Sequence, residues 1–386
     1  MKKFTKKDKL YLSRAFELAR LGRFTTPPNP NVGCVIVQKD SIIGEGYHKK
    51  AGSDHAEICA LKSTTKSVRG STVYVTLEPC SHYGKTPPCT TALIEAKVKK
   101  VIASTIDPNP KISGKGFEIL KKSGIQVEYN FMQNIAKNLN PGFFKRMKFG
   151  IPWIKLKLAS TLDGRTATNC GISKWITSSK ARQNVQELRA ESDAILSSAT
   201  SILQDQSKLT VRWHEFSNKI KNIYPKNEIR QPIRIVIDNL NQIKPNHAFI
   251  KQNGKILLIR TKEDKLIWPN YITKIILDNT RYDLNQNTKN INLSELMIKL
   301  GKLKINNILI ESGARLSGAF LNAGLLDEII LYQAPKILGE KARPLFFLSE
   351  SIRLDNAPKF SISNVCRIGE DVRFNLKPIK RKIKKI

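Results

Sequence analysis

Four residues between positions 55 and 89 have the side-chain types of a catalytic zinc site. His55 and Glu57 stand two residues apart, and Cys80 and Cys89 follow them. One imidazole and two thiolates hold zinc while leaving a position open, and a carboxylate that does not bind the metal can carry protons. A His, two Cys and a free Glu perform hydrolytic deamination of nitrogen heterocycles. The run therefore predicts a zinc ion with Glu57 as proton carrier beside it.

The surrounding pattern predicts how these side chains are positioned. His55 begins an apolar-periodic run that predicts a helix, so Glu57 faces the same cavity. The apolar strand 72–77 ends at Glu78-Pro79-Cys80, and Cys89 opens a helix over 90–96. We expect both thiols near helix N-termini, where the helix dipole favours the thiolate that binds zinc.

The spacing leaves two interpretations of the metal site to weigh. Cys89 lies nine residues after Cys80, unlike the short Pro-Cys-x-x-Cys spacing of many nucleobase deaminases. A structural zinc site would normally take four protein ligands, and His82 is the one nearby candidate for a fourth. We therefore favour a catalytic site and treat His82 as a bystander. Cys34 and Cys59 lie in apolar runs and are interpreted as small core residues.

Composition and charge limit the class of protein. A chain of 386 residues exceeds what one core usually serves, so two domains are expected. Its formal net charge of +34 raises nucleic acid as a partner, but the lysines are dispersed, which favours compositional drift. The one dense basic run, in the segment 377–386, is interpreted as a solvated tail. No apolar segment follows the basic N-terminus and none is long enough to span a bilayer, so we expect a cytoplasmic protein.

The first 150 residues alternate between helical and strand patterns. A helix is expected over 9–21, strands over 32–37 and 42–47, and a turn at 39–41 between them. Strands at 98–105 and 125–129 flank a short helix at 117–122, which indicates a mostly parallel sheet with helices on its faces. The loop Asp107-Pro108-Asn109-Pro110 follows a strand end, where such folds place ligands, although a rigid turn explains it equally well.

A second domain is expected to begin after a helix at 134–144 and a linker at 148–152. The alternating run 153–158 starts a new sheet, and further strands are expected at 255–260, 272–277 and 328–333, with a helix at 293–303. Asp163-Gly164 predicts a tight hairpin turn. The strand 308–312 leads into a helix begun by Gly313, whose N-terminus would suit a cofactor diphosphate. No zinc motif recurs here, and no Gly-x-Gly-x-x-Gly opens a helix.

Several of these stretches together resemble the bacterial bifunctional deaminase–reductase family of riboflavin biosynthesis, over nearly the whole chain. The resemblance rests on Asn29-Pro30-Asn31-Val32-Gly33, His55-Ala56-Glu57, Thr76-Leu77-Glu78-Pro79-Cys80, Gly84-Lys85-Thr86-Pro87-Pro88-Cys89, Asp107-Pro108-Asn109-Pro110, Leu158-Ala159-Ser160-Thr161-Leu162-Asp163-Gly164-Arg165, Ser173-Lys174-Trp175-Ile176-Thr177, Leu209-Thr210-Val211-Arg212 and Glu311-Ser312-Gly313-Ala314-Arg315-Leu316. It implies an α/β fold with a cytidine-deaminase-like three-layer α/β/α domain at 1–147 and a dihydrofolate-reductase-like α/β domain at 151–376. The long gap between the two Cys is a feature of this family.

The resemblance also implies roles for individual residues. One zinc ion would be held by His55, Cys80 and Cys89, with Glu57 as the proton carrier, and a diaminopyrimidine phosphoribosylamine would be deaminated. NADPH would then reduce the sugar, and a homodimer is plausible. Cofactor contacts would come from Ala159, Trp175, Ser201, Asp205, Asn239, Gly313, Ala314, Arg315, Leu316, Ser317, Gly318 and Ala319. Substrate contacts would come from Ser173, Arg189, Leu209, Arg212 and Glu311, the two Arg gripping the ribose phosphate.

Three positions depart from the family pattern. Gln206 and Ser207 stand where the family usually has a second Asp and a Pro, and Asn239 replaces a small hydroxyl residue. The departures motivate the hypothesis of a second domain that only binds. A further alternative is a tRNA or single-stranded DNA base deaminase with a non-catalytic C-terminal domain. It would predict salt-sensitive binding, but aromatic residues make up 7% of the chain and form no stacking ribbon.

Overall fold

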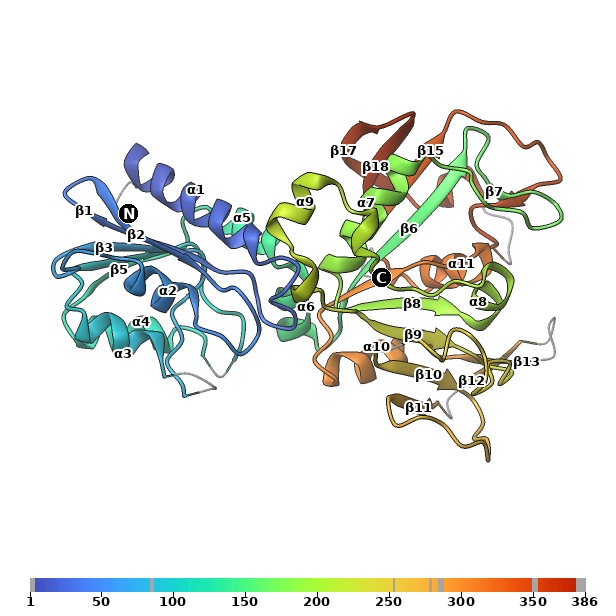
Figure 1. The fold of residues 1–386 in the computed structure, drawn as a ribbon, viewed down its shortest axis with the longest axis horizontal. Helices are drawn as coiled ribbons and strands as arrows, with labels where there is room; N and C mark the ends of the chain where they lie inside the picture. Colours follow the sequence, from blue (N-terminus) through green and yellow to red (C-terminus); the bar gives the residue numbers. More distant parts are fainter. Residues whose placement is uncertain are drawn as a thin grey trace. The chain divides into compact units, whose positions relative to one another are not determined.

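The computed structural model describes residues 4–83, 87–110, 112–252, 254–277, 280–283, 288–348 and 353–379. The chain divides into two compact units, Met1–Ile151 and Pro152–Ile386 (Figure 1). Helix α6 (Pro141–Phe149) reaches into the segment expected as a linker, so the connection between the units is shorter than predicted.

The sheet of the first unit has the order β2-β1-β3-β4-β5. Its strands are β1 (Gly33–Gln38), β2 (Ser41–Tyr47), β3 (Thr72–Val75), β4 (Lys100–Ala103) and β5 (Gln126–Glu128). Strands β3, β4 and β5 are parallel, whereas β1 is antiparallel to both β2 and β3. The sheet is therefore mixed and not mostly parallel, because β1 and β2 form a hairpin. Its turn residues Lys39 and Asp40 have φ of 47° and 61°, as a tight hairpin turn requires.

Helices cover both faces of this sheet, which gives the three expected layers. On one face α2 (Ala56–Lys62), α3 (Cys89–Glu95) and α4 (Lys115–Lys122) form one core with the strands. On the other, α1 (Lys6–Leu21) and α5 (Gln133–Leu139) form a second core (Figure 1). The predicted single helix at 134–144 is wrong: α5 ends at Leu139 and α6 starts at Pro141. The Asn140 side chain between them bonds the backbone N–H (2.7 Å) and carbonyl (2.9 Å) of Asn31, and Pro141 suits a first helical turn.

In the described part of the second unit, nine strands form one sheet in the order β11-β10-β9-β8-β14-β6-β15-β18-β17. The seven strands from β11 to β15 in this order are parallel, and β18 is antiparallel to both of its neighbours, β15 and β17. Their bounds are β6 (Trp153–Thr161), β8 (Ala194–Ser198), β9 (Ile233–Ile237), β10 (Ile256–Arg260), β11 (Ile272–Ile276), β14 (Asn307–Ile310), β15 (Glu328–Ala334), β17 (Phe360–Ile368) and β18 (Asp371–Pro378).

Two short ribbons lie outside the large sheet. Strand β7 (Arg165–Ala167) pairs with β16 (Arg343–Pro344), and β12 (Thr280–Asp283) pairs with β13 (Thr288–Ile291). Gly164 makes the predicted turn, with φ of 73°, but β7 pairs with β16 and not with β6, so Asp163-Gly164 does not close a hairpin. The Asp163 carboxylate instead accepts from the backbone N–H groups of Leu338 and Gly339.

Helices connect the parallel strands of the second unit. They are α7 (Ser179–Glu191), α8 (Ala199–Asp205), α9 (Asn218–Ile223), α10 (Leu293–Lys302) and α11 (Ala314–Asn322), with single 3₁₀ turns at Trp213–Glu215, Lys226–Glu228 and Leu354–Asn356. The carboxyl ends of the parallel strands meet at one edge, where open α/β sheets bind ligands. Of the predicted basic tail, Lys377 and Pro378 belong to β18, and residues 380–386 lie outside the described residues.

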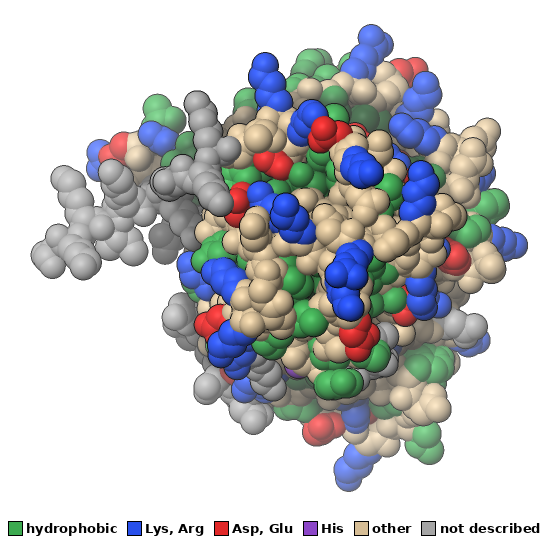
Figure 2. Space-filling model, turned by 90° about the vertical axis from the view of Figure 1, so that its left-hand side faces the viewer, with side chains coloured by type: hydrophobic (Ala, Val, Ile, Leu, Met, Phe, Trp, Pro, Cys, Tyr) green, Lys and Arg blue, Asp and Glu red, His purple; other side chains and the backbone are tan. Residues whose placement is uncertain are grey.

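The surface charge is dispersed on the face that Figure 2 shows. Lys and Arg side chains are spread singly over this face, with acidic side chains between them. Among the described residues, no helix is both long and apolar enough to cross a bilayer.

Candidate active sites

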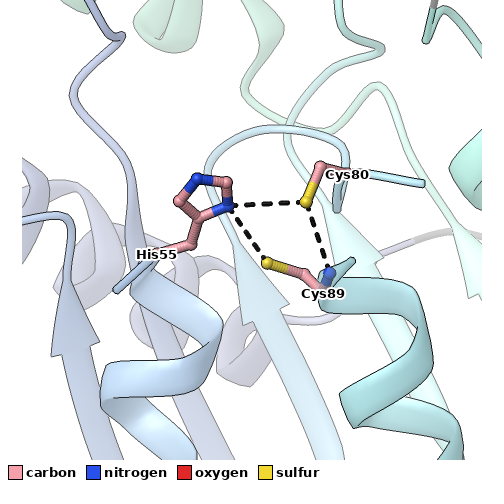
Figure 3. A group of neighbouring side chains, drawn as sticks. All are labelled: His55, Cys80 and Cys89. Atoms are coloured by element: carbon pink, nitrogen blue, oxygen red, sulfur yellow. Dashed lines mark hydrogen bonds between the residues drawn. The ribbon is translucent and has the colours of Figure 1, made fainter. Parts of the chain in front are cut away.

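The three predicted zinc ligands come together in the first unit. His55 is the N-cap residue of α2, Cys80 lies in the segment after β3, and Cys89 is the first residue of α3 (Figure 3). The His55 Nδ1 atom lies 3.3 Å from Cys89 Sγ and 3.4 Å from Cys80 Sγ. Over the described chain, this is the one group of three His, Cys, Asp or Glu side chains with ligand atoms gathered within 4.8 Å, and His82 is not part of it.

These distances fit a tetrahedral zinc ion. Zinc binds imidazole nitrogen at about 2.0–2.1 Å and thiolate sulfur at about 2.3 Å, so a tetrahedral angle puts the two ligand atoms about 3.5 Å apart. The observed nitrogen–sulfur separations of 3.3 and 3.4 Å are close to that value. With three protein ligands, a fourth position stays open for water.

The contact between the two thiols favours the loss of one proton from the pair. The pKa of Cys80 is lowered, chiefly because the Cys89 thiol donates to its sulfur, and further because His55 and the Cys89 backbone N–H also bond to that sulfur. The pKa of Cys89 is raised by the same contact with Cys80 and by burial. The pair of thiols therefore loses one proton readily and shares the other between the two sulfurs. A divalent cation supplies the charge that favours the loss of the second.

Glu57 lies in the first turn of α2, beside the cluster. Its side chain is 3% exposed and contacts the Cys89 thiol. Burial, followed by the charge of Cys80, raises the pKa of Glu57 to about 7. A carboxyl group that titrates near neutrality can both take and return a proton, so this position suits a proton carrier.

Side chains that the sequence motifs did not assign surround the cluster. His48 is buried, and its ring lies edge-on to that of His55 with centroids 5.5 Å apart. Its Nε2 lies 3.0 Å from the Asn29 side-chain amide, and burial lowers the pKa of His48, so the neutral ring is favoured. Asp107 is also buried, and burial raises its pKa to about 7, with Glu78 and Cys80 adding to the effect. The sequence marked the loop at 107–110 as a place where such folds bind ligands, but neither the spacing of His48 nor that of Asn29 indicated that they lie beside the cluster.

In the second unit, two predicted substrate residues bind each other. The Arg189 Nε and Nη2 atoms donate to the two oxygens of Glu311 at 2.6 and 2.9 Å, and Nη1 donates to the Thr210 carbonyl at 3.0 Å. Their side chains are 8% and 12% exposed. Glu311 overcomes the effect of burial and raises the pKa of Arg189, and Arg189 likewise lowers the pKa of Glu311. Arg189 therefore binds a carboxylate within the protein, whereas the sequence predicted that it binds the ribose phosphate of the substrate.

Lys157 is a further candidate that the sequence motifs missed. It lies on β6, two residues before Ala159, so both side chains point to the same face of the sheet. Its ammonium group interacts electrostatically with Glu311, Arg189 and Asp205, and burial lowers its pKa. The signal was present in the sequence, since Lys155 and Lys157 alternate with apolar residues, but alternation does not identify which lysine meets an active site.

Arg212 is the more accessible of the two predicted arginines. Its side chain is 33% exposed and makes a two-pronged ion pair with Glu215. Buried Gln186 accepts from the Arg212 backbone N–H at 3.0 Å and donates to Glu215 at 2.9 Å. Leu209, in the same segment, is buried with φ of 49°. The segment 209–212 is thus held by side chains from elsewhere in the second unit.

The N-terminus of α11 lies at the carboxyl end of β14, as predicted. Gly313 is its N-cap residue, its backbone N–H donates to Ser201 Oγ at 3.2 Å, and no acidic residue lies in the first turn. The helix start is thus open to an anion, which fits a cofactor diphosphate. The predicted contact residues do not all face one way: a Cβ added to Gly318 would lie 2.0 Å from the Phe347 carbonyl oxygen, so Gly318 packs against that segment.

The other predicted cofactor and substrate residues lie on nearby loops and helix ends. Trp175 is 61% exposed, and the Arg182 guanidinium lies 4.4 Å above its ring. Ser173 hydrogen bonds the carboxylate of Asp205, the last residue of α8. Gln206 adopts φ of 48°, and Asn239 follows β9, with its carbonyl accepting from Thr261. Of the residues that depart from the family pattern, Gln206 therefore ends α8 in the left-handed region, and Asn239 lies in a turn after β9.

Two family models match the chain, one in each unit. The zinc-binding region of cytidine and deoxycytidylate deaminases matches residues 5–105, and the RibD C-terminal domain matches residues 152–374. The riboflavin biosynthesis proteins RibD of Escherichia coli K12 and Buchnera aphidicola subsp. Baizongia pistaciae are 48% and 49% identical to this chain. Each alignment covers 96% of the chain and 99% or 98% of the relative.

Solved structures agree with these relatives. Acinetobacter baumannii RibD (form 1) superposes with a TM-score of 0.88 at 39% identity, covering 97% of this chain and 99% of its own. A Thermotoga maritima protein, described as a diaminohydroxyphosphoribosylaminopyrimidine deaminase/5-amino-6-(5-phosphoribosylamino)uracil reductase, superposes with a TM-score of 0.83 at 31% identity, with the same coverage.

Fold and site together define a zinc-dependent deaminase joined in one chain to an NADPH-dependent reductase. The chain belongs to the RibD family, the bifunctional deaminase–reductases of riboflavin biosynthesis. The family resemblance, the fold class and the two cofactors predicted from sequence are confirmed. The alternative of a nucleic-acid base deaminase with a non-catalytic second domain is not favoured.

Proposed function

We propose that the first unit deaminates 2,5-diamino-6-(5-phosphoribosylamino)pyrimidin-4(3H)-one to 5-amino-6-(5-phosphoribosylamino)uracil, and that the second reduces the ribosyl group of that product to ribityl with NADPH. The observation that carries the proposal is the gathering of His55, Cys80 and Cys89 next to the buried carboxyl group of Glu57. The substrate assignment draws on the described activity of the Thermotoga maritima relative.

In the deaminase, we assign zinc binding to the cluster and proton transfer to Glu57. When bound, zinc activates a water molecule at neutral pH. A carboxylate oxygen of Glu57 would take a proton from the attacking water and give it to the leaving nitrogen, so that ammonia would depart as the new carbon–oxygen bond replaces the carbon–nitrogen bond. The raised pKa of Glu57 supports this exchange. Neutral His48 and Asn29, hydrogen-bonded together, are proposed to line the substrate pocket.

In the reductase, the α11 N-terminus is proposed to hold the cofactor diphosphate, with Ala159, Trp175, Ser201, Asp205 and Asn239 as further contacts. NADPH supplies the hydride. The two arginines are given different tasks. Arg189 is buried against Glu311 and orients that carboxylate toward the substrate, whereas Arg212 is exposed enough to exchange Glu215 for the substrate phosphate. Ser173 and the buried Leu209 complete the proposed substrate contacts.

Lys157 is proposed to hold a proton at Nζ near the sugar. Its position between Glu311 and Asp205, on the β6 face that carries Ala159, supports this role. A cationic group there favours binding of an anionic substrate and can compensate negative charge that develops on a sugar oxygen.

One experiment tests both activities. The chain is incubated with the diaminopyrimidine substrate with and without NADPH, and the products are separated by mass. We expect ammonia and the uracil product without NADPH, and the ribitylamino product with it. Ammonia release without any NADPH-dependent product would restrict the function to the first unit, and recovery of unchanged substrate in both reactions would contradict the proposal.

We further propose a cytoplasmic homodimer that has no nucleic-acid partner. The cysteines among the described residues are free thiols, two of them in the zinc cluster, and suit a reducing compartment. The dispersed Lys and Arg side chains in Figure 2 support a solvated basic surface. Light scattering tests the dimer. A binding titration with tRNA at two salt concentrations tests the partner, because tight binding that weakens steeply with salt would contradict this part of the proposal.

A further inference from the structure

Glu78 lies two residues before the zinc ligand Cys80 and binds a segment about thirty residues further along the chain. Its Oε2 accepts hydrogen bonds from the backbone N–H groups of Asp107 (3.0 Å) and Gly114 (2.9 Å), and its Oε1 accepts one from Gly116 (2.9 Å). The residue is 4% exposed. A buried carboxylate that accepts three backbone N–H groups is held in one orientation, because losing any of these bonds leaves a buried donor or charge unpaired.

The same carboxylate caps helix α4 from a distance. Gly114 is the N-cap residue of α4, with φ of 83°, and it has no side chain with which to accept from the first N–H groups of the helix. Glu78 accepts from two backbone N–H groups at this end and places a negative charge at the positive end of the helix dipole. The capping that α4 lacks in its local sequence is therefore supplied by the zinc-binding segment.

Gly116 makes the contact between the two segments close. A Cβ atom added to Gly116 would lie 2.2 Å from the Pro79 carbonyl oxygen and 3.1 Å from Glu78 Oε1. No methyl group fits between the start of α4 and the backbone that leads into Cys80. The two segments therefore form one joint, and a shift of either must move the other.

This joint determines where the Asp107 loop (Asp107–Pro110) stands relative to the zinc cluster. The Asp107 backbone N–H is bound by Glu78, and its carboxylate accepts from the Asn109 N–H at 2.8 Å. The Asp107 carboxyl group is buried and lies close enough to Cys80 to interact with its charge. The loop therefore borders the cluster, at the carboxyl end of β4.

We propose that Glu78 is a positioning residue of the deaminase, fixing the Asp107 loop against the zinc-binding segment so that one wall of the substrate pocket is preformed. The inference rests on the deaminase activity proposed above. Glu78 itself contacts neither substrate nor metal. Its contribution is to binding: a loop held in place loses no freedom when the substrate arrives, so the cost of ordering it is not subtracted from affinity.

Glu78→Gln tests the proposal with a side chain of the same size. The amide removes the charge and turns an NH₂ group toward a backbone N–H, so at least one of the three bonds is lost. Loss of a hydrogen bond to a charged group frees the Asp107 loop, and substrate binding must then order it. We therefore expect KM for the diaminopyrimidine to rise about ten-fold or more. Zinc content and NADPH-dependent turnover of the deaminated substrate should stay unchanged. A purely structural role would reduce the fraction of active enzyme, which lowers apparent kcat and leaves KM as it was.

Two further variants complete the experiment. Glu118→Gln makes the same chemical change on an exposed side chain in the first turn of α4, and its KM should match wild type. Gly116→Ala strains the same joint by sterics alone, and its KM should rise with that of Glu78→Gln. If Glu78→Gln is recovered unfolded, the KM and zinc content of Gly116→Ala decide the question in its place.

The outcomes distinguish failure of the positioning role of Glu78 from failure of the deaminase function. A KM increase of about five-fold or more with zinc retained supports the positioning role. A smaller increase, or loss of zinc from Glu78→Gln, overturns it while wild type still releases ammonia. Absence of ammonia release by zinc-loaded wild type overturns the proposed deaminase function, and the role of Glu78 with it.

Discussion

Replacing Glu57 with Gln is the most direct test of the deaminase chemistry. The amide keeps the shape of a side chain that is 3% exposed, so packing around α2 should be preserved. It cannot accept and return a proton. General acid–base catalysis by one positioned group contributes about 10²–10⁴-fold. Among the described neighbours, His48 is held neutral by burial and bonded to Asn29, and the Asp107 carboxylate is bonded to the Asn109 backbone N–H. We therefore expect kcat for ammonia release to fall by about 10²–10⁴-fold.

The assay follows ammonia by a coupled reaction and zinc by elemental analysis of the same sample. Zinc content should equal that of wild type because the three ligand atoms come from His55, Cys80 and Cys89. Turnover of the deaminated substrate by the second unit supplies an internal control, and Glu95→Gln, an exposed residue on α3, supplies a matched one. Glu57→Gln with full zinc and more than half of wild-type ammonia release would refute the proton-carrier role. Loss of zinc would instead indicate that Glu57 binds the metal.

Three further predictions concern the ligands and the second unit. Cys80→Ala should remove zinc and ammonia release but leave NADPH oxidation with the deaminated substrate intact; zinc analysis showing a full complement would contradict the site. Lys157→Met should lower reductase kcat/KM, followed by NADPH absorbance, by about 10²-fold through loss of the cation that interacts with Glu311 and Asp205, and it should leave ammonia release unchanged. Glu311→Gln should destabilise the second unit by about 3 kcal/mol, because buried Arg189 loses its carboxylate. The pKa of Glu311 is lowered in the folded state. Its contribution to the free energy of unfolding is therefore fully present above the pKa of an unfolded Glu, near 4.3, and is lost as the pH falls through the lower pKa of the folded state. The free energy of unfolding, measured by urea denaturation between pH 3 and 6, should therefore depend less steeply on pH in the variant than in wild type. Equal pH dependence of this free energy in the two proteins would count against the ion pair.

Residues close together in sequence account for most of the deaminase site. His55 and Glu57 stand within one helical turn, and each Cys follows a strand or opens a helix. Those local contexts restrict the backbone strongly enough that side-chain type and spacing predict a shared metal. The alternation of strand and helix patterns also predicted two α/β units, although it could not indicate that β1 pairs antiparallel with β3, since pairing partners are chosen by the packing of the whole sheet.

The reductase site depended on tertiary structure to a greater extent. The sequence carries Arg189, Arg212 and Glu311 as separate charged residues. Only the folded chain brings Arg189 to Glu311 across 122 residues, and leaves Arg212 paired with Glu215 at the surface. Burial decides which charge binds a partner within the protein and which can exchange that partner for a substrate, and burial is a property of the packed sheet and not of local sequence.

The sequence by itself thus determined the family to which the chain belongs and the three side chains that gather as a zinc cluster, and it supplied Glu57 as the proposed proton carrier. Tertiary structure alone decided how that chemistry is supported. Glu78 reaches Gly116 across 38 residues, Lys157 meets Glu311 from another strand, and His48 lies against His55. The first two contacts depend on strands and helices distant in sequence being packed side by side, and the third depends on how the short loop between β2 and α2 folds back on itself. The periodicity of a single element carries no information about which neighbour it will have.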